Sequence, residues 1–217
     1  MPTLNFKAKM IAPDLEKEIK KEIRAKIKNF WQSKSEQIRL GCSKIYFKHI
    51  KAHQTYIDLE NQTRFKGEMG VTEAVLANFM EDLEARLDDL FEADYVAHAG
   101  SNDLGGVLAY IPNYQDYVYE MEGIEYTTSP NRNEETFNIP WLKWLLRDGT
   151  NDVVFDYHFI PSSSRISRTG LGLMMPGGSF SVDPQYAGIH NNNWFTQAAD
   201  NARPEIMNFI VDILKEL

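Results

Sequence analysis

The sequence predicts an α+β protein in which a long N-terminal helix and further helices pack on a mainly antiparallel β-sheet with a projecting hairpin. Apolar residues recur every four positions near the N-terminus, short β-branched and aromatic runs occupy the middle, and a second helical pattern closes the chain. The 217 residues, 43% of them hydrophobic, can bury a core without disulfides. We divide the chain into a basic amphipathic helix region, residues 1–60, and an α+β domain, residues 61–217.

The first helix is predicted to begin at Pro13, because proline suits the first helical position and Asp14 suits the helix dipole. We expect one long amphipathic helix, interrupted if at all near residues 33–35 or at Gly41. Its narrow apolar stripe suits a sheet or another subunit better than a membrane surface, since acids interrupt the polar face. The stripe consists of Leu15, Ile19, Ile23, Ile27, Phe30, Trp31, Ile38, Ile45 and Ile50.

A second helix is predicted from Thr72, a suitable N-cap followed by Glu73. We expect its buried face to consist of Val75, Leu76, Phe79, Leu83, Leu87, Leu90 and Phe91. Three short strands are then predicted, at residues 95–99, 106–111 and 117–121, because β-branched and aromatic runs alternate there with Gly, Asn, Asp and Pro.

The last third predicts a short apolar helix at residues 140–146 and a hairpin of strands 152–160 and 169–175. Gly170 and Gly172 in the return strand suggest a bulge or a close backbone approach. A final helix is expected over residues 192–215, after an asparagine turn that supplies its N-cap. We expect Pro204 to kink or divide this helix.

The net charge of −8 is unevenly distributed. Residues 1–53 contain 13 Lys and Arg against 5 Asp and Glu, a net of +8, and residues 54–217 contain 10 against 26, a net of −16. This polarity favours head-to-tail contact between copies or with neighbours, although a merely solvated basic helix face would also explain it. The acidic bulk of the chain argues against a module that binds duplex DNA, because it would repel phosphate.

No phosphate-binding loop, dinucleotide fingerprint or hydrolase motif occurs. His49 and His53 lie four apart on a predicted helix, which is weak support for a metal site. His158 and Asp156 would share one side of a strand, as an acid–base pair or, more simply, as a surface pair. Cys42 is interpreted as a buried apolar residue. We therefore expect no catalytic residue, no cofactor and no metal.

Several segments resemble the tail-completion, or neck, proteins of tailed bacteriophages, in the order that this family shows. Together they cover about residues 60–200. The segments are residues 65–70 (FKGEMG), 139–149 (IPWLKWLLRDG), 152–157 (DVVFDY), 164–174 (SRISRTGLGLM), 182–188 (VDPQYAG) and 193–198 (NWFTQA). Lys143 departs from the family, which commonly has an acid there, and the acidic, tyrosine-rich stretch 113–138 is longer than usual.

The resemblance implies a virion protein without catalytic residues, made in the host bacterial cytoplasm and located at the head–tail junction. It implies a homo-oligomeric ring around the DNA channel, between the portal or adaptor and the tail terminator, and we prefer six copies to twelve. One alternative is the tail terminator itself, which caps the tail tube. A remote alternative is a small virion-associated hydrolase that uses His158 and Asp156, or His98 and Asp103. We expect no signal peptide and no membrane partner.

The candidate interface residues are of three kinds. Arg165 and Arg168 would lie at the tip of the predicted hairpin, where they could meet acids on a neighbouring subunit or, passively, DNA in the channel; we prefer the neighbour. Trp141 and Trp144, three apart on a helical turn, suit either core anchors or interface residues. A tyrosine-rich strand, which suits a wet interface, is represented by Tyr117 and Tyr119.

Overall fold

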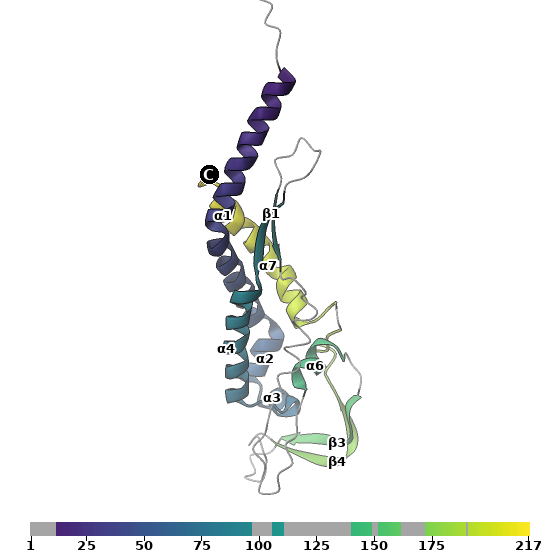
Figure 1. Ribbon diagram of the computed structural model, residues 1–217. Helices are drawn as coiled ribbons and strands as arrows, with labels where there is room; N and C mark the ends of the chain where they lie inside the picture. The colour runs from purple at the N-terminus through teal and green to yellow at the C-terminus, as the bar shows by residue number, and fades with distance from the viewer. Residues whose placement is uncertain (1–11, 97–105, 111–139, 149–151, 162–171, 190) are drawn as a thin grey trace, which may run out of the picture.

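The computed structural model describes residues 12–96, 106–110, 140–148, 152–161, 172–189 and 191–217. Figure 1 shows an elongated molecule in which α1 extends upward beyond α7, while β3 and β4 lie at the opposite end. The helices are α1 (Ala12–Ala52), α2 (Gln54–Asn61), α3 (Thr63–Met69), α4 (Glu73–Leu90), α6 (Trp141–Leu146) and α7 (Trp194–Leu214). The strands are β1 (Glu92–Val96), β2 (Gly106–Tyr110), β3 (Asp152–Pro161) and β4 (Gly172–Ser181).

Helix α1 is continuous, so the interruption considered near residues 33–35 or at Gly41 does not occur. Ser33 and Ser35 donate their hydroxyl hydrogens to carbonyls three residues earlier, an arrangement that helices tolerate. Gly41 marks a close helix crossing, because a Cβ there would lie 2.1 Å from the ring of Phe209 on α7. This glycine therefore admits a neighbouring helix instead of ending its own.

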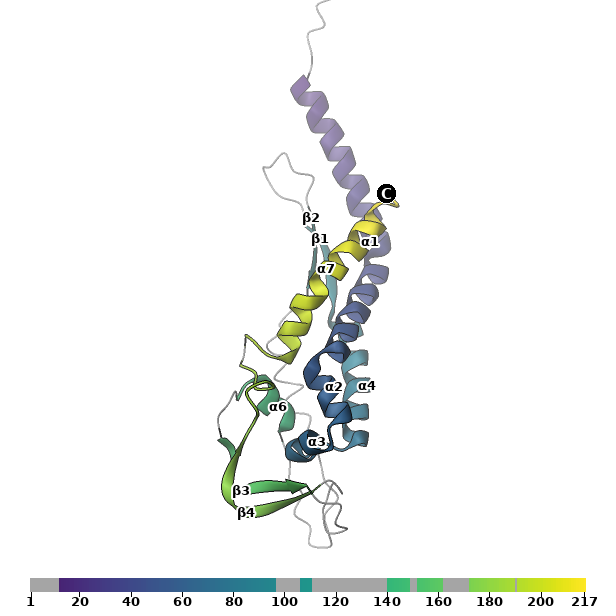
Figure 2. The same ribbon diagram turned by 180° about the vertical axis from the view of Figure 1, so that it is seen from behind.

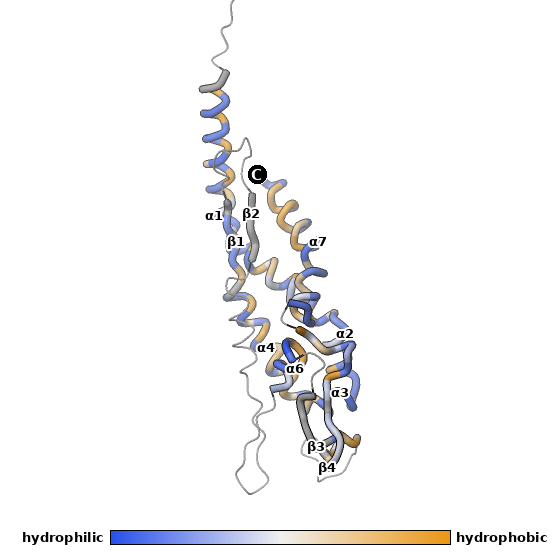
Figure 3. The backbone as a smooth tube through the Cα atoms, turned by 90° about the vertical axis from the view of Figure 1, so that its right-hand side faces the viewer, coloured by the Kyte–Doolittle hydropathy of each residue, from blue (hydrophilic) through white to orange (hydrophobic). Residues whose placement is uncertain are grey.

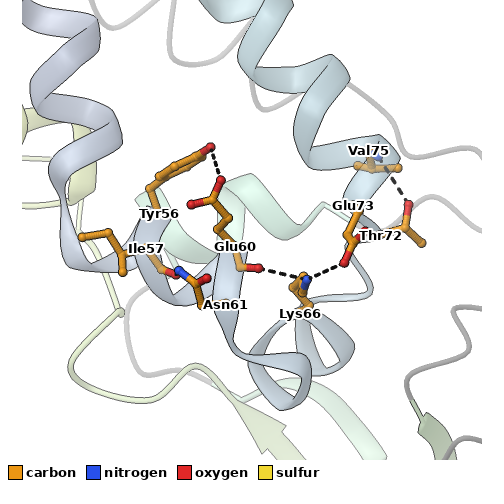
Figure 4. Close-up of polar contacts among 8 residues, drawn as sticks. All are labelled: Tyr56, Ile57, Glu60, Asn61, Lys66, Thr72, Glu73 and Val75. Carbon is orange, nitrogen blue, oxygen red and sulfur yellow. Dashed lines mark hydrogen bonds and ion pairs between the residues drawn. The ribbon is translucent and has the colours of Figure 1, made fainter.

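Two short helices, α2 and α3, precede α4 and were not predicted. The buried Lys66 of α3 donates to the carbonyl of Glu60 at 3.0 Å and pairs with the carboxylate of Glu73 at 3.3 Å (Figure 4). Thr72 accepts a hydrogen bond from the backbone N–H of Val75, which confirms the predicted N-cap of α4. These contacts hold α3 against the start of α4.

The described strands form two separate antiparallel pairs, β1 with β2 and β3 with β4. In the second pair, Pro161 lies opposite Gly172, and the register shifts twice between Asp152 and Tyr157. A Cβ on Gly172 would lie 2.2 Å from the Phe159 ring, which confirms the predicted close approach at this glycine. Residues 97–99, 111 and 169–171, the ends of three predicted strands, lie outside the described residues, as does the whole predicted strand 117–121.

Helix α7 runs without a break through Pro204, so of the two outcomes expected there, a kink or a division, the division does not occur. It lies along α1, and its N-terminal end is fixed beside the C-terminal end of α1 by a hydrogen bond from the Trp194 indole N–H to the Ile50 carbonyl. At its other end, Lys34 pairs with Glu216. The two helices are therefore antiparallel neighbours over much of the length of α7 (Figure 2).

The hydrophobic core lies where α1 packs against α7 on one side and α4 on the other. The predicted face of α4 is confirmed at Leu76, Phe79, Leu83, Leu87 and Phe91, all buried. With helices forming the core and antiparallel strand pairs attached to it, the protein is α+β, as predicted.

Candidate functional site

Four of the six candidate interface residues lie outside the described residues. These are Arg165, Arg168, Tyr117 and Tyr119. The described part of the β3–β4 hairpin ends at Pro161 and resumes at Gly172, so the tip at which both arginines were expected belongs to the segment between them. Their role at an interface stays a prediction.

Trp141 and Trp144 are both buried, on helix α6. The Trp141 ring meets Phe79 of α4 edge to face, with ring centroids 5.1 Å apart. Of the two roles that the sequence left open, burial supports the core anchor, and the surface of this protomer does not include these indoles. We therefore remove both residues from the candidate interface.

Asn193 stands at the centre of a junction between the end of α6 and the start of α7. Its side-chain oxygen accepts hydrogen bonds from the N–H groups of Phe195 and Thr196, at 3.0 and 3.1 Å, which confirms the predicted N-cap. Its amide nitrogen donates to the carbonyls of Leu146 and Ile189, at 3.2 and 3.1 Å. One buried side chain thus joins three segments of the chain.

Tyr186 links the same region to α2. Its hydroxyl donates to the carboxylate of Asp58 at 2.6 Å, and its ring stacks on Phe65 with centroids 4.0 Å apart. Burial, together with the hydrogen bond to Asp58, raises the pKa of Tyr186 to about 12. Gln54 also donates to Asp58, so the buried carboxylate has two donors. The hydroxyl is thereby kept in its neutral, donating form.

The described histidines bind partners on other elements and do not converge. His49 lies 3.0 Å from a carboxylate oxygen of Glu205, and His53 lies 3.0 Å from the side-chain oxygen of Gln197. Hydrogen bonds from Lys48 and then from His49 hold the pKa of Glu205 below its usual value. His158 is exposed, and its Nδ1 lies 2.6 Å from a β4 backbone carbonyl. His98 and Asp103 lie outside the described residues, and nothing is described of the side chain of Asp156.

The first part of α1, residues 15–30, has an apolar row that is exposed toward the N-terminus and half-buried at Ile27 and Phe30; we call residues 15–30 the projecting segment. Figures 1 and 3 show it extending past α7, with apolar positions recurring among hydrophilic ones. Its stripe is exposed at Leu15 (61%), Ile19 (49%) and Ile23 (37%). The same side of the helix continues through the buried Trp31 to the buried Ile38 and Cys42. The apolar stripe of α1 is therefore exposed at its N-terminal end and lies in the hydrophobic core farther along the helix.

A second uncovered apolar surface lies on α7. Met207 and Val211 are 60% and 49% exposed, and Leu214 beside them is partly buried. Spacings of four and three residues place these three side chains on one face of the helix. We call this face the α7 ridge. Its residues do not belong to any motif that the sequence had singled out.

The two surfaces differ in charge. The projecting segment contains six Lys and Arg against three Glu, a net of +3. Residues 205–217, which include the α7 ridge, contain three acids against Lys215, a net of −2. Each of these three acids pairs with a lysine of its own chain, so the α7 ridge is close to neutral and the projecting segment is the more strongly charged of the two surfaces.

No family model, no curated protein and no solved structure matches this chain. Within the described ranges, no group of three or more His, Cys, Asp or Glu side chains is placed to hold a metal ion. None of the helices in the described part of the chain has the length and apolar character needed to cross a membrane. Inference about function therefore depends on the sequence motifs and on the contacts and surfaces above.

Proposed function

We propose that this chain is a non-enzymatic structural subunit of the neck of a tailed-bacteriophage particle, where copies of it form a ring around the DNA channel at the head–tail junction. The observation that carries the proposal is the ordered series of motifs between residues 60 and 200 that resembles tail-completion proteins. Portal or adaptor proteins on one side and the tail terminator on the other are the partners that this role requires.

The contacts among the motif residues support this proposal. Asn193 of the NWFTQA motif donates to the carbonyl of Leu146 in the IPWLKWLLRDG motif. Gly188 of the VDPQYAG motif packs so closely that a Cβ there would lie 2.2 Å from the Leu145 carbonyl oxygen. Tyr186 of the same motif stacks on Phe65 of the FKGEMG motif. The motif residues are far apart in the sequence but pack together in the structure. If this chain has the fold of tail-completion proteins, the motifs would be similar in both because they form this packed unit.

The use of polar side chains also supports a structural role. His49 and His53 contact Glu205 and Gln197, so both histidines link the α1–α2 region to α7. Groups engaged in contacts between helices hold elements together and are not set up to exchange protons with a substrate. A ring subunit further needs two different surfaces that fit each other, and the projecting segment and the α7 ridge are two surfaces with exposed apolar rows and different charge.

The proposal is tested by disrupting the gene in its source phage. We expect filled heads and complete tails that do not join, and we expect purified protein added to the lysate to restore joined, infectious particles. Electron microscopy of negatively stained lysates distinguishes these products directly. Normal joining in the absence of the gene product would refute the proposal.

The same experiment separates a neck protein from a tail terminator. A neck protein is expected to arrive on heads or at the junction, leaving isolated tails of normal length when it is missing. A terminator is expected on isolated tails, and its loss gives tails of irregular length. Immunogold labelling of separated heads and tails gives the answer, and negative stain of the purified protein gives the copy number, for which we prefer six to twelve.

A further inference from the structure

We propose that the projecting segment of one copy packs along the α7 ridge of a second copy, in a head-to-tail contact that repeats from subunit to subunit. This inference rests on the proposed ring-forming function and names the surfaces through which the ring is built. The second copy is the occupant because the chain itself presents one exposed apolar row on a basic helix segment and another on a helix face that lacks this excess of positive charge.

The apolar surface of both partners supports direct packing. Ten large hydrophobic side chains are exposed in the described part of the chain, and five of them lie on these two helix faces. Leu15, Ile19 and Ile23 form a row with a four-residue spacing, and Met207 and Val211 form another. Rows of this spacing on two helices interdigitate in the commonest class of helix packing. Exposed apolar rows flanked by charge are typical of interaction sites.

Charge favours this pairing over the symmetrical alternative. Two projecting segments would bring together two helices of net charge +3, which repel each other. A projecting segment against a second copy instead brings +3 beside a chain of net charge −8, at a surface whose three acids pair with lysines of their own chain and which therefore does not repel the segment as a second projecting segment would. This difference in charge therefore selects a contact between different surfaces, which closes into a ring only by rotation.

A projecting segment cannot reach the α7 ridge of its own chain. Gly41 of α1 touches Phe209, which lies on α7 between Met207 and Val211. Ile19 precedes Gly41 by 22 residues in the same continuous helix. That distance is about 33 Å along the helix axis. A contact between these two surfaces is consequently always a contact between two molecules.

Cysteine cross-linking tests the contact directly. The native Cys42 is buried, and burial raises the pKa of its thiol to about 11, so it does not compete for a maleimide at neutral pH. We would mix the Ile19→Cys and Val211→Cys variants and treat the mixture with a short bis-maleimide. A two-chain product is expected from the mixture and not from either variant alone. No product from the mixture, or a product from Ile19→Cys alone, would overturn the proposal.

Substitutions that remove the apolar rows provide a second measurement. Ile19→Gln with Ile23→Gln, and separately Met207→Gln with Val211→Gln, keep good helix formers at exposed positions, so the monomer should fold as before. We expect each pair to weaken self-association by on the order of a hundredfold, about tenfold for each apolar side chain lost. Light scattering after size exclusion measures the mass, and circular dichroism checks the fold. The matched control is Ile57→Gln, at 37% exposure on α2, which should leave the ring intact.

The outcomes separate this inference from the proposed function. Rings that persist in both double variants would refute the contact while leaving a neck role intact, and a wild-type protein that stays monomeric at all concentrations would refute the contact too. Cross-linked rings from a protein whose gene is dispensable for head–tail joining would instead refute the neck role and leave the contact standing.

Discussion

Replacing Asn193 tests whether the junction between α6 and α7 holds the fold together. In an ordinary N-cap, Asn and Asp are nearly equivalent, because only the side-chain oxygen is used. Here the amide nitrogen also donates to the carbonyls of Leu146 and Ile189, in a buried setting. Asn193→Asp keeps the capping oxygen but sets a carboxylate against two carbonyl oxygens. We therefore expect Asp to be a poor substitute at this one position.

The magnitude follows from the bonds that are lost. Asn193→Ala removes the cap, at about 1 kcal/mol. It also takes the amide donor from the buried Leu146 carbonyl, at about 1 kcal/mol, whereas the Ile189 carbonyl still accepts from the N–H of Asn192. The free energy of unfolding should fall by about 2 kcal/mol, and Asn193→Asp should cost as much near neutral pH, because the buried carboxylate is next to oxygen atoms. A urea titration followed by circular dichroism would show the midpoint falling by about 1 M or more.

The two variants should differ in their dependence on pH. Burial and the facing carbonyls disfavour the ionised form, so the pKa of the carboxyl introduced by Asn193→Asp is raised in the folded state. Its cost is then fully present above that raised pKa and shrinks as the pH falls toward about 3.9, the unfolded value. The deficit of Asn193→Ala relative to wild type should not change over this range.

The matched control is the N-cap of α4. Thr72 accepts a hydrogen bond from the N–H of Val75, and among the described residues its hydroxyl donates to no buried carbonyl. Thr72→Ala should cost about 1 kcal/mol and Thr72→Asp close to nothing. If Asn193→Asp were as stable as wild type at pH 7, the reasoning that the Asn193 amide stabilises the fold by donating to two carbonyls would be refuted.

Three further predictions concern other buried groups. Cys42, with its thiol pKa raised to about 11 by burial, should not react with a disulfide reagent at pH 8 in the folded protein and should react as one thiol in urea. Burial and the hydrogen bond to Asp58 raise the pKa of Tyr186 to about 12, so the stabilisation from its neutral hydroxyl should be complete below about pH 10 and lost as the pH rises through 12. Tyr186→Phe should lower the free energy of unfolding by about 1–3 kcal/mol at pH 7. Thermal melts of this variant should no longer show the loss of stability at alkaline pH. Gly188→Ala would place a methyl group 2.2 Å from a backbone carbonyl oxygen and should lower the free energy of unfolding by roughly 2 kcal/mol or more. Gly177→Ala is the control, because a Cβ at that position meets nothing within 4 Å. It should cost only the strain of the positive φ, about 1 kcal/mol.

The elements that the sequence predicted well are those with a strong local signal. Thr72 and Asn193 are caps by residue type, and the apolar rows of α1, α4 and α7 have a clear helical period. Helices α2 and α3 were missed because each is only two turns long, too short for a period to emerge. Pro204 did not divide α7, because the surrounding packing against α1 holds the helix through it.

The candidate interface residues were harder to predict, because whether a side chain is buried depends on which element packs against it. The spacing of apolar residues along the sequence does not identify that element. Trp141 looked equally suited to a core and to an interface, and only the position of Phe79 decides for the core. The α7 ridge has no motif at all, because Met207 and Val211 differ from buried positions only in what covers them. A hydropathy pattern identifies which face of a helix is apolar, but it does not identify the element that covers that face.

The length difference between α1 and α7 explains why one end of a uniform stripe is surface. With 41 residues, α1 is about 62 Å long, whereas the 21 residues of α7 span about 32 Å. The antiparallel α7 begins beside Ile50 and ends beside Lys34, so it cannot cover anything before that point. Yet Leu15, Ile19 and Ile23 keep the period of the buried part. An apolar row that continues for several turns beyond its partner in the same chain implies a partner in another molecule, and the exposed apolar row of α7, which does not repel the basic segment, meets that need most directly.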